Sequence, residues 1–237
     1  MTLPGDTDPS HGTARSEPNA AATTSLTAIA SQLTGAEALS ELRSLLKAGL
    51  KTYPDFPKVN ACRITPPDLS LTRWSKEGIL FEDILPLFAS PSLHQALIRA
   101  YELQIIETLG RDNLPDVIVG LDARGFLFGP TLALRFGAGF VPVRKAGKLP
   151  GKIETAEFQK EYGTDTFAMQ TDAIKPGQKV LVVDDLIATG GSAAAAGTLV
   201  EKCGGTLLGY FFIIELTFLR GRDKLNAPVY TLLESQS

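Results

Sequence analysis

The sequence has few of the residues that build disulfide frameworks and zinc sites. Its two cysteines are Cys62 and Cys203, and its two histidines are His11 and His94. All four lie far apart, and none is at a spacing typical of metal ligands. A zinc site and a disulfide framework are therefore not expected, and a reducing compartment is the default.

Long apolar runs and a strong excess of one charge are also missing. The longest apolar run, Leu207–Ile214, is too short to span a bilayer, and the N-terminus lacks the apolar core of a signal peptide. The net charge of -3 argues against a general nucleic-acid binder, which usually carries a basic stripe. We expect a cytoplasmic protein with no nucleic-acid partner and no membrane partner.

The 237-residue chain is long enough for one α/β domain with appendages. Residues 1–33 are rich in small and polar residues and are predicted to be a flexible extension, and residues 34–237 are predicted to form the domain. Helical patterns occupy about residues 34–49, 90–110, 131–136 and 192–203, and strand patterns occupy about residues 117–121, 140–143, 166–170, 179–183, 207–214 and 229–232. This alternation predicts a central, mostly parallel sheet flanked by helices.

The most informative segment runs from Val180 to Ser192. Four apolar residues end in two adjacent carboxylates, Asp184 and Asp185, and a loop of small residues follows. The loop consists of Ala188, Thr189, Gly190, Gly191 and Ser192. A continuous apolar run is typical of a strand buried in a parallel sheet, and the loop after such a strand with the next helix start can hold a phosphate. The carboxylates would repel that phosphate, so we expect them to accept hydrogen bonds from ribose hydroxyls.

This order of strand, paired acids and small-residue loop resembles the phosphoribosyl pyrophosphate (PRPP) signature of the type I phosphoribosyltransferases. The resemblance implies that Asp184 and Asp185 hold the ribose of PRPP, and that the loop holds its 5′-phosphate. It covers about residues 54–232, with one interruption. A structural turn with two solvated acids at a strand end is the alternative explanation for the motif taken alone.

Two further segments carry groups suited to pyrophosphate. Residues 120–130, GLDARGFLFGP, follow a strand pattern, and residues 144–151, RKAGKLPG, place three cations within five residues. Both resemble segments of the family members that act on adenine, although Ala123 replaces a serine-like residue, and in those members the second segment closes over PRPP. The pyrophosphate ligands implied are Asp122, Ala123, Arg124, Arg144, Lys145 and Lys148. Taken alone, the two segments also fit a helix-capping arginine and a solvated loop.

At Ala188 the sequence differs from the family members that act on 6-oxopurines, and this difference assigns the general acid-base role to another residue. Family members that act on 6-oxopurines have an aspartate at this position, and alanine cannot transfer protons. In members that act on adenine, the role falls to the glutamate of an EYG sequence, here Glu161-Tyr162-Gly163. The resemblance implies that Glu161 stabilises the protonated purine N7, that Tyr162 helps to position the pyrophosphate or ribose, and that Arg124 stabilises the leaving pyrophosphate.

The base-binding segment implied by the resemblance is GILFEDI, residues 78–84. Phe81 offers a face for stacking a purine, and backbone groups near Leu80 and Glu82 would read the edge of adenine. Phe81 as an ordinary core residue is the alternative. The PDFP sequence at residues 54–57 lies almost next to this segment in the family, so residues 58–75 are predicted to be an insertion in a small hood.

The activity implied is transfer of the phosphoribosyl group of PRPP to adenine, which gives AMP and pyrophosphate. Mg²⁺ is expected, bound mainly through PRPP, pyrophosphate and water rather than through protein ligands. The resemblance also implies a homodimer. Two alternatives remain open: a phosphoribosyltransferase for another base such as xanthine or orotate, and a regulatory protein that binds PRPP without turnover.

Overall fold

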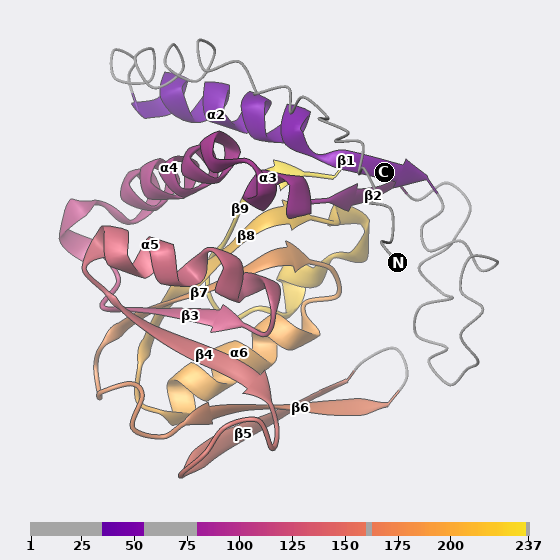
Figure 1. Cartoon of the computed structure of the whole chain (residues 1–237). Coiled ribbons are helices and arrows are strands. Elements are labelled where there is room, and N and C mark those ends of the chain that lie inside the picture. Colours follow the sequence, from indigo (N-terminus) through magenta and orange to yellow (C-terminus); the bar gives the residue numbers. More distant parts are fainter. Residues whose placement is uncertain (1–34, 55–79, 160–162, 236–237) are drawn as a thin grey trace, which may run out of the picture. The chain divides into compact units, whose positions relative to one another are not determined.

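The computed structural model describes residues 35–54, 80–159 and 163–235, and its core is a seven-stranded sheet with the order β5-β6-β4-β3-β7-β8-β9 (Figure 1). The strands are β3 (Val117–Leu121), β4 (Gly139–Lys145), β5 (Ile153–Gln159), β6 (Thr164–Gln170), β7 (Lys179–Ile187), β8 (Thr206–Glu215) and β9 (Val229–Glu234). Strands β4, β3, β7, β8 and β9 run parallel, and β6 pairs antiparallel with both β4 and β5. The predicted mostly parallel sheet is confirmed.

Helices cover both faces of this sheet because side chains alternate along each buried strand. Figure 1 shows α2 (Gly35–Gly49), α3 (Leu85–Ala89), α4 (Pro91–Leu109), α5 (Gly129–Phe136) and α6 (Gly191–Lys202). On β7, Leu181 and Val183 pack into the cluster that contains residues of α2 to α5, whereas Val180 and Val182 pack into the cluster that contains residues of α6. Strand β7 is therefore buried on both sides, as its apolar run predicts.

Short 3-10 turns and a second sheet complete the described part of the chain. The turns are η1 (Arg111–Asn113), η2 (Arg124–Leu127), η3 (Thr217–Leu219) and η4 (Gly221–Lys224). The second sheet pairs β1 (Lys51–Pro54) antiparallel with β2 (Leu80–Asp83), with Tyr53 opposite Phe81. The predicted extension at residues 1–33 and the predicted insertion at residues 58–75 lie outside the described residues.

Local signals account well for the helix ends. The amide of Leu93 donates to the Ser90 side chain (3.4 Å), which caps α4, and Pro91 occupies the first turn. The same helix is followed by Gly110, whose φ of +78° favours glycine. The helix predicted over about residues 90–110 is therefore confirmed.

The structure corrects two predicted segments. Residues 153–159 are not among the predicted strands, but they form β5, in which the buried side chains of Ala156 and Phe158 alternate with exposed ones. Phe158 packs on Phe167 of β6, with ring centroids 4.6 Å apart. Strand β7 also extends beyond the predicted boundary, through both acids to Ile187, because β8 continues to pair with it there.

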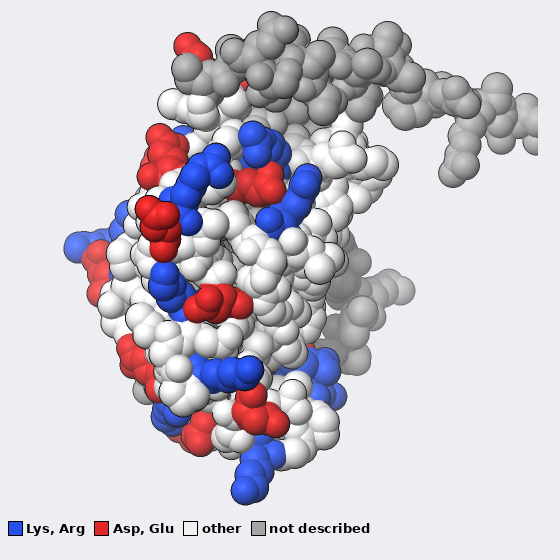
Figure 2. Space-filling view, turned by 90° about the vertical axis from the view of Figure 1, so that its left-hand side faces the viewer, with Lys and Arg blue, Asp and Glu red and all other residues white. Residues whose placement is uncertain are grey.

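Figure 2 shows one face of the protein, on which Lys and Arg side chains are interspersed with Asp and Glu side chains. None of the helices within the described residues is long and apolar enough to cross a membrane.

Two leucines of helix α5 provide a matched test of which face of the helix packs into the core. Leu132 is fully buried, whereas Leu134 on the same helix is 82% exposed. We predict that Leu132→Ala lowers the free energy of unfolding by about 2–5 kcal/mol, because it removes packed methyl groups and leaves a cavity. The matched variant Leu134→Ala should change it by no more than about 0.5 kcal/mol. Denaturant unfolding measures both, and equal costs would contradict this packing.

Candidate active site

The alignment of β3 with β7 brings the predicted ribose and pyrophosphate segments together. The two strands are parallel neighbours, with Gly120 opposite Val183, but β3 ends at Leu121 while β7 continues along β8. The edge of β7 beyond Val183 therefore faces the turn that follows β3. A Cβ atom added to Gly125 in that turn would lie 2.8 Å from the carbonyl oxygen of Val183, so only glycine permits this approach.

The paired acids form a poorly neutralised cluster at this edge of the sheet. Asp185 is 5% exposed and Asp184 is partly buried. Burial raises the pKa of Asp184 well above its usual range, and repulsion by the Asp185 carboxylate raises it further. Burial also raises the pKa of Asp185, and the guanidinium of Arg124 opposes that rise. The pair therefore retains a proton more readily than two exposed acids would, and Asp184 is the more strongly affected member.

Each predicted arginine, and the first predicted lysine, already has an acidic partner. Arg124 Nε lies 2.9 Å from Asp185 Oδ2, and Arg144 Nε lies 3.0 Å from Asp122 Oδ2. Arg144 also donates to the backbone carbonyl of Lys148 (3.3 Å). Arg144 therefore contacts two other predicted pyrophosphate ligands, Asp122 and Lys148.

The third cation, Lys145, lies with its Nζ 3.3 Å from Asp165 Oδ2 on β6. The side chains of Arg124, Arg144 and Lys145 are between 37% and 59% exposed, so their ion pairs are weak enough to exchange for a pyrophosphate.

The small-residue loop has the geometry of a helix start that can hold an anion. Gly190 adopts the left-handed conformation with φ +78°, and α6 begins at Gly191. The first amides of a helix have no partner within the helix, and the helix dipole places partial positive charge at the same end. These amides follow directly after the acid pair, as expected for groups that bind the two ends of one sugar phosphate.

The remaining residues predicted for the site are Ala123, three residues of the base-binding segment, and Glu161 with Tyr162. Ala123 follows the only cis peptide bond among the described residues, after Asp122, and its carbonyl accepts from Phe126 (3.1 Å). Leu80, Phe81 and Glu82 lie on β2 of the second sheet. Their role in base binding stays a prediction. Glu161 and Tyr162 lie outside the described residues.

Tyr101 is not among the residues predicted for the site, but it belongs to the surroundings of the acid pair. It is fully buried on α4 and stacks on Phe128, with centroids 5.2 Å apart and an 11° angle between the rings. Burial raises the pKa of its phenol, and Asp185 and Asp184 raise it further, so these acids lie within electrostatic range. A tyrosine in an apolar helix pattern carries no signal that distinguishes this position from ordinary core.

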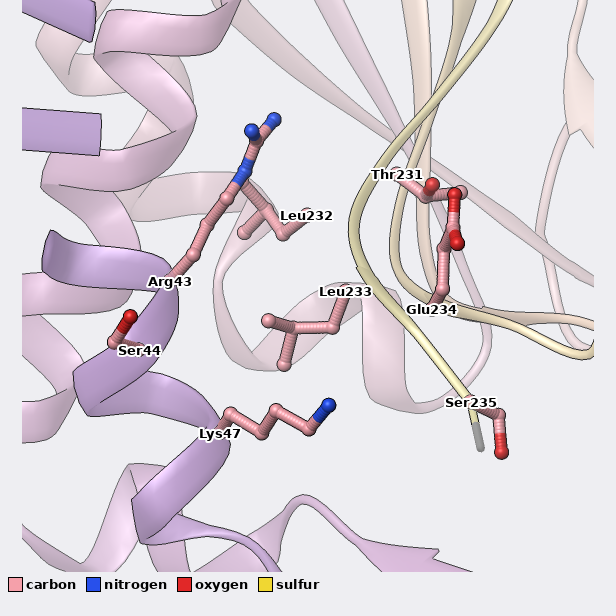
Figure 3. A pocket seen from close by; sticks show the side chains of 8 residues that line it. All are labelled: Arg43, Ser44, Lys47, Thr231, Leu232, Leu233, Glu234 and Ser235. Carbon is pink, nitrogen blue, oxygen red and sulfur yellow. The ribbon is translucent and has the colours of Figure 1, made fainter. Parts of the chain in front are cut away.

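A separate pocket lies between α2 and β9 (Figure 3). Its volume is about 450 Å³, and its lining residues are Arg43, Ser44, Lys47, Thr231, Leu232, Leu233, Glu234 and Ser235. None of these is a residue predicted for the site.

Comparison with known proteins agrees with the fold. Residues 90–234 match the phosphoribosyl transferase domain, the class of protein to which this sheet and acid pair point. An adenine phosphoribosyltransferase of Yarrowia lipolytica is 60% identical over 198 residues, which cover 84% of this chain and 98% of that protein. The chain belongs to the type I phosphoribosyltransferase family, within its adenine phosphoribosyltransferase branch.

Solved structures support the same placement. The adenine phosphoribosyltransferase of Saccharomyces cerevisiae, in complex with an imino-altritol bisphosphate and adenine, superposes with a TM-score of 0.72 at 53% identity and covers 82% of this chain and 99% of its own. The Trypanosoma brucei enzyme, in complex with AMP, pyrophosphate and ribose-5-phosphate, superposes with a TM-score of 0.65 at 27% identity and covers 81% and 79%.

The raised pKa of Asp184 predicts how stability depends on pH. An acid whose pKa is higher in the folded than in the unfolded state contributes stability below the unfolded pKa, and this contribution is lost as pH rises through the folded pKa. Asp184→Asn removes this loss, so we expect the variant to be more stable than wild type at pH 8, by on the order of 1 kcal/mol.

Thermal unfolding between pH 4 and pH 8 measures the difference, which should shrink as the pH falls. The control is Asp172→Asn, which replaces an exposed carboxylate. An advantage of Asp184→Asn that stays constant over this range would contradict the assignment.

Proposed function

We propose that this protein transfers the phosphoribosyl group of PRPP to adenine, giving AMP and pyrophosphate. The observation that carries the proposal is the meeting of Asp184 and Asp185 with Arg124 at the end of β7, directly before a helix start suited to phosphate. The identity to adenine phosphoribosyltransferases supports adenine as the acceptor base.

The acid pair would hold the ribose, and residues 188–192 would hold the 5′-phosphate. The ribose hydroxyls would donate to Asp184 and Asp185, whose one ion pair within the described part of the chain is that of Asp185 with Arg124. When pyrophosphate reaches Arg124, that side chain changes its partner from Asp185 to phosphate oxygens. The exchange frees the Asp185 carboxylate for a ribose hydroxyl, so the two halves of PRPP would assist each other in binding.

The chemistry requires stabilisation of the leaving group and of a proton on the base. As the bond from the sugar carbon to pyrophosphate breaks, positive charge builds on the sugar and negative charge on pyrophosphate. Arg124, Arg144 and Lys145 would stabilise the leaving charge, with help from Asp122, Ala123 and Lys148 in positioning it. Glu161 would stabilise the protonated N7 of the purine, and Tyr162 would position the pyrophosphate or ribose.

Three further features belong to the proposal. Mg²⁺ would be held mainly by PRPP, pyrophosphate and water, because the described residues contain no group of three or more acidic, histidine or cysteine side chains that could hold a metal ion, and when bound it would offset the charge of the pyrophosphate. Adenine would stack on Phe81, with backbone near Leu80 and Glu82 reading its edge. We further propose a homodimer located in the cytoplasm, without a nucleic-acid or membrane partner.

Base preference tests the proposed reaction directly. With PRPP and Mg²⁺, we expect pyrophosphate release with adenine, and far less with hypoxanthine, guanine, xanthine or orotate. Parallel assays of pyrophosphate with each base measure this. Turnover with another base instead of adenine would overturn the base assignment, whereas PRPP binding without turnover of any base would favour a regulatory protein.

Glu161 offers a test of the proton-handling step. We expect Glu161→Ala to lower kcat with adenine by about 10²–10⁴-fold, the usual contribution of general acid-base catalysis. The control is Glu157→Ala, which removes an exposed carboxylate from β5 on the same stretch of chain. Steady-state kinetics at saturating PRPP measure both variants. A Glu161→Ala rate equal to wild type would remove Glu161 from the mechanism.

A further inference from the structure

The small-residue loop at residues 188–192, here called the phosphate loop, contacts the backbone of a second segment. We call this second segment, residues 216–224, the supporting segment. A Cβ atom added to Gly221 would lie 2.9 Å from the amide nitrogen of Gly190, and still closer to the carbonyl oxygen of Ala188. A Cβ atom added to Gly190 would lie 2.9 Å from the carbonyl carbon of Gly221. The two backbones therefore touch with no side chain between them, and Gly221 is buried.

One ion pair fixes the supporting segment to the sheet. The guanidinium of Arg222 donates from Nε to Glu215 Oε1 at 2.8 Å, and from a terminal nitrogen to Glu215 Oε2. Glu215 is only 2% exposed and is the last residue of β8. A bidentate contact between an arginine and a buried carboxylate restricts orientation as well as distance. Residue 221, which precedes the arginine, is thereby held at a defined place.

Glu215, the buried partner in this ion pair, lies next to the start of the phosphate loop. Glu215 stands opposite Ile187 in the pairing of β7 with β8, and the amide of Leu216 donates to the Ile187 carbonyl (3.0 Å). Ile187 immediately precedes Ala188, the first residue of the phosphate loop. The loop is thus held from its own strand on one side and from Gly221 on the other. A shift of Arg222 would move the second of these supports.

We propose that Glu215, Gly221 and Arg222 are positioning residues that set the affinity of the Ala188–Ser192 loop for the 5′-phosphate of PRPP and AMP. The inference rests on the proposed role of that loop. None of the three residues needs to touch the substrate. Because the 5′-phosphate is held in the same way before and during reaction, a displaced loop should raise the KM for PRPP and leave kcat nearly unchanged.

Two variants disturb the support in different ways. Arg222→Lys keeps the positive charge but removes the bidentate contact, and Gly221→Ala keeps the ion pair but pushes a methyl group against the loop. We expect each to raise the KM for PRPP and the Kd for AMP about tenfold, with kcat and the KM for adenine within about twofold of wild type. Steady-state kinetics and calorimetric titration with AMP measure these quantities.

The control is Arg220→Lys, the same substitution two residues earlier in the supporting segment. Arg220 pairs with Asp223 at the surface and its side chain is 80% exposed, so all four constants should stay within about twofold of wild type. Thermal unfolding establishes the temperature range in which each variant is folded, and the assays are done within that range.

Three results would overturn the inference. Constants equal to wild type in both Arg222→Lys and Gly221→Ala would show that the support does not matter for phosphate affinity. An equal rise of the KM for adenine, together with a fall in kcat, would indicate general damage instead of selective loss. Wild-type protein that binds AMP no more tightly than adenosine would remove the proposed role of the loop itself, and this last result separates a failure of the proposed function from a failure of the inference.

Discussion

The in-register parallel pairing of β3 with β7 is the constraint on which the site depends. Parallel strands present their carboxyl ends at one edge of a sheet, so the turn after β3 and the acids of β7 must meet there. The pairing also places Arg124 within 2.9 Å of Asp185. Strand β4 is aligned with β3 on the other side, with Leu121 opposite Val143, and so brings Arg144 to Asp122. Strand pairing alone therefore brings charged residues from three separate stretches of sequence to one edge of the sheet, and no long loop is needed.

The charges of this site divide into a fixed part and an exchangeable part. Asp184 and Asp185 belong to a strand bonded to β8 and are poorly exposed, so they cannot move to find other partners. The cations of the site, Arg124, Arg144 and Lys145, are on half-exposed side chains, and the ion pairs of such side chains contribute about 0–1 kcal/mol each. An anionic ligand can therefore take over the cations at little cost. The acids gain partners only from hydroxyl groups or a cation that the ligand brings.

Sequence patterns predicted the parts of this arrangement that depend on local structure. The apolar run before Asp184 and the small residues after it predicted a buried strand and a helix start, and both are present. Long-range pairing was harder to predict. Strand β5 was missed because its alternation of buried and exposed side chains depends on packing against Phe167 of β6. The extension of β7 was missed because carboxylates are unusual in strands, and the pairing with β8 that continues past them is a long-range contact. The partners of Arg144 and Lys145 depend on register, which a single sequence does not specify.

Three acidic residues near this edge of the sheet show how a structural carboxylate differs from one available to a ligand. Glu215 is 2% exposed, yet Arg222 donates to both of its oxygens, so its charge is neutralised within the protein. Among the described residues, Arg124 is the one cation that acts on both Asp184 and Asp185, and burial raises the pKa of both. A protein that leaves two neighbouring acids so poorly compensated loses stability near neutral pH. Under the proposed function, the ribose hydroxyls of the substrate would supply further donors, so incomplete neutralisation by cations, rather than burial alone, would distinguish the proposed binding site.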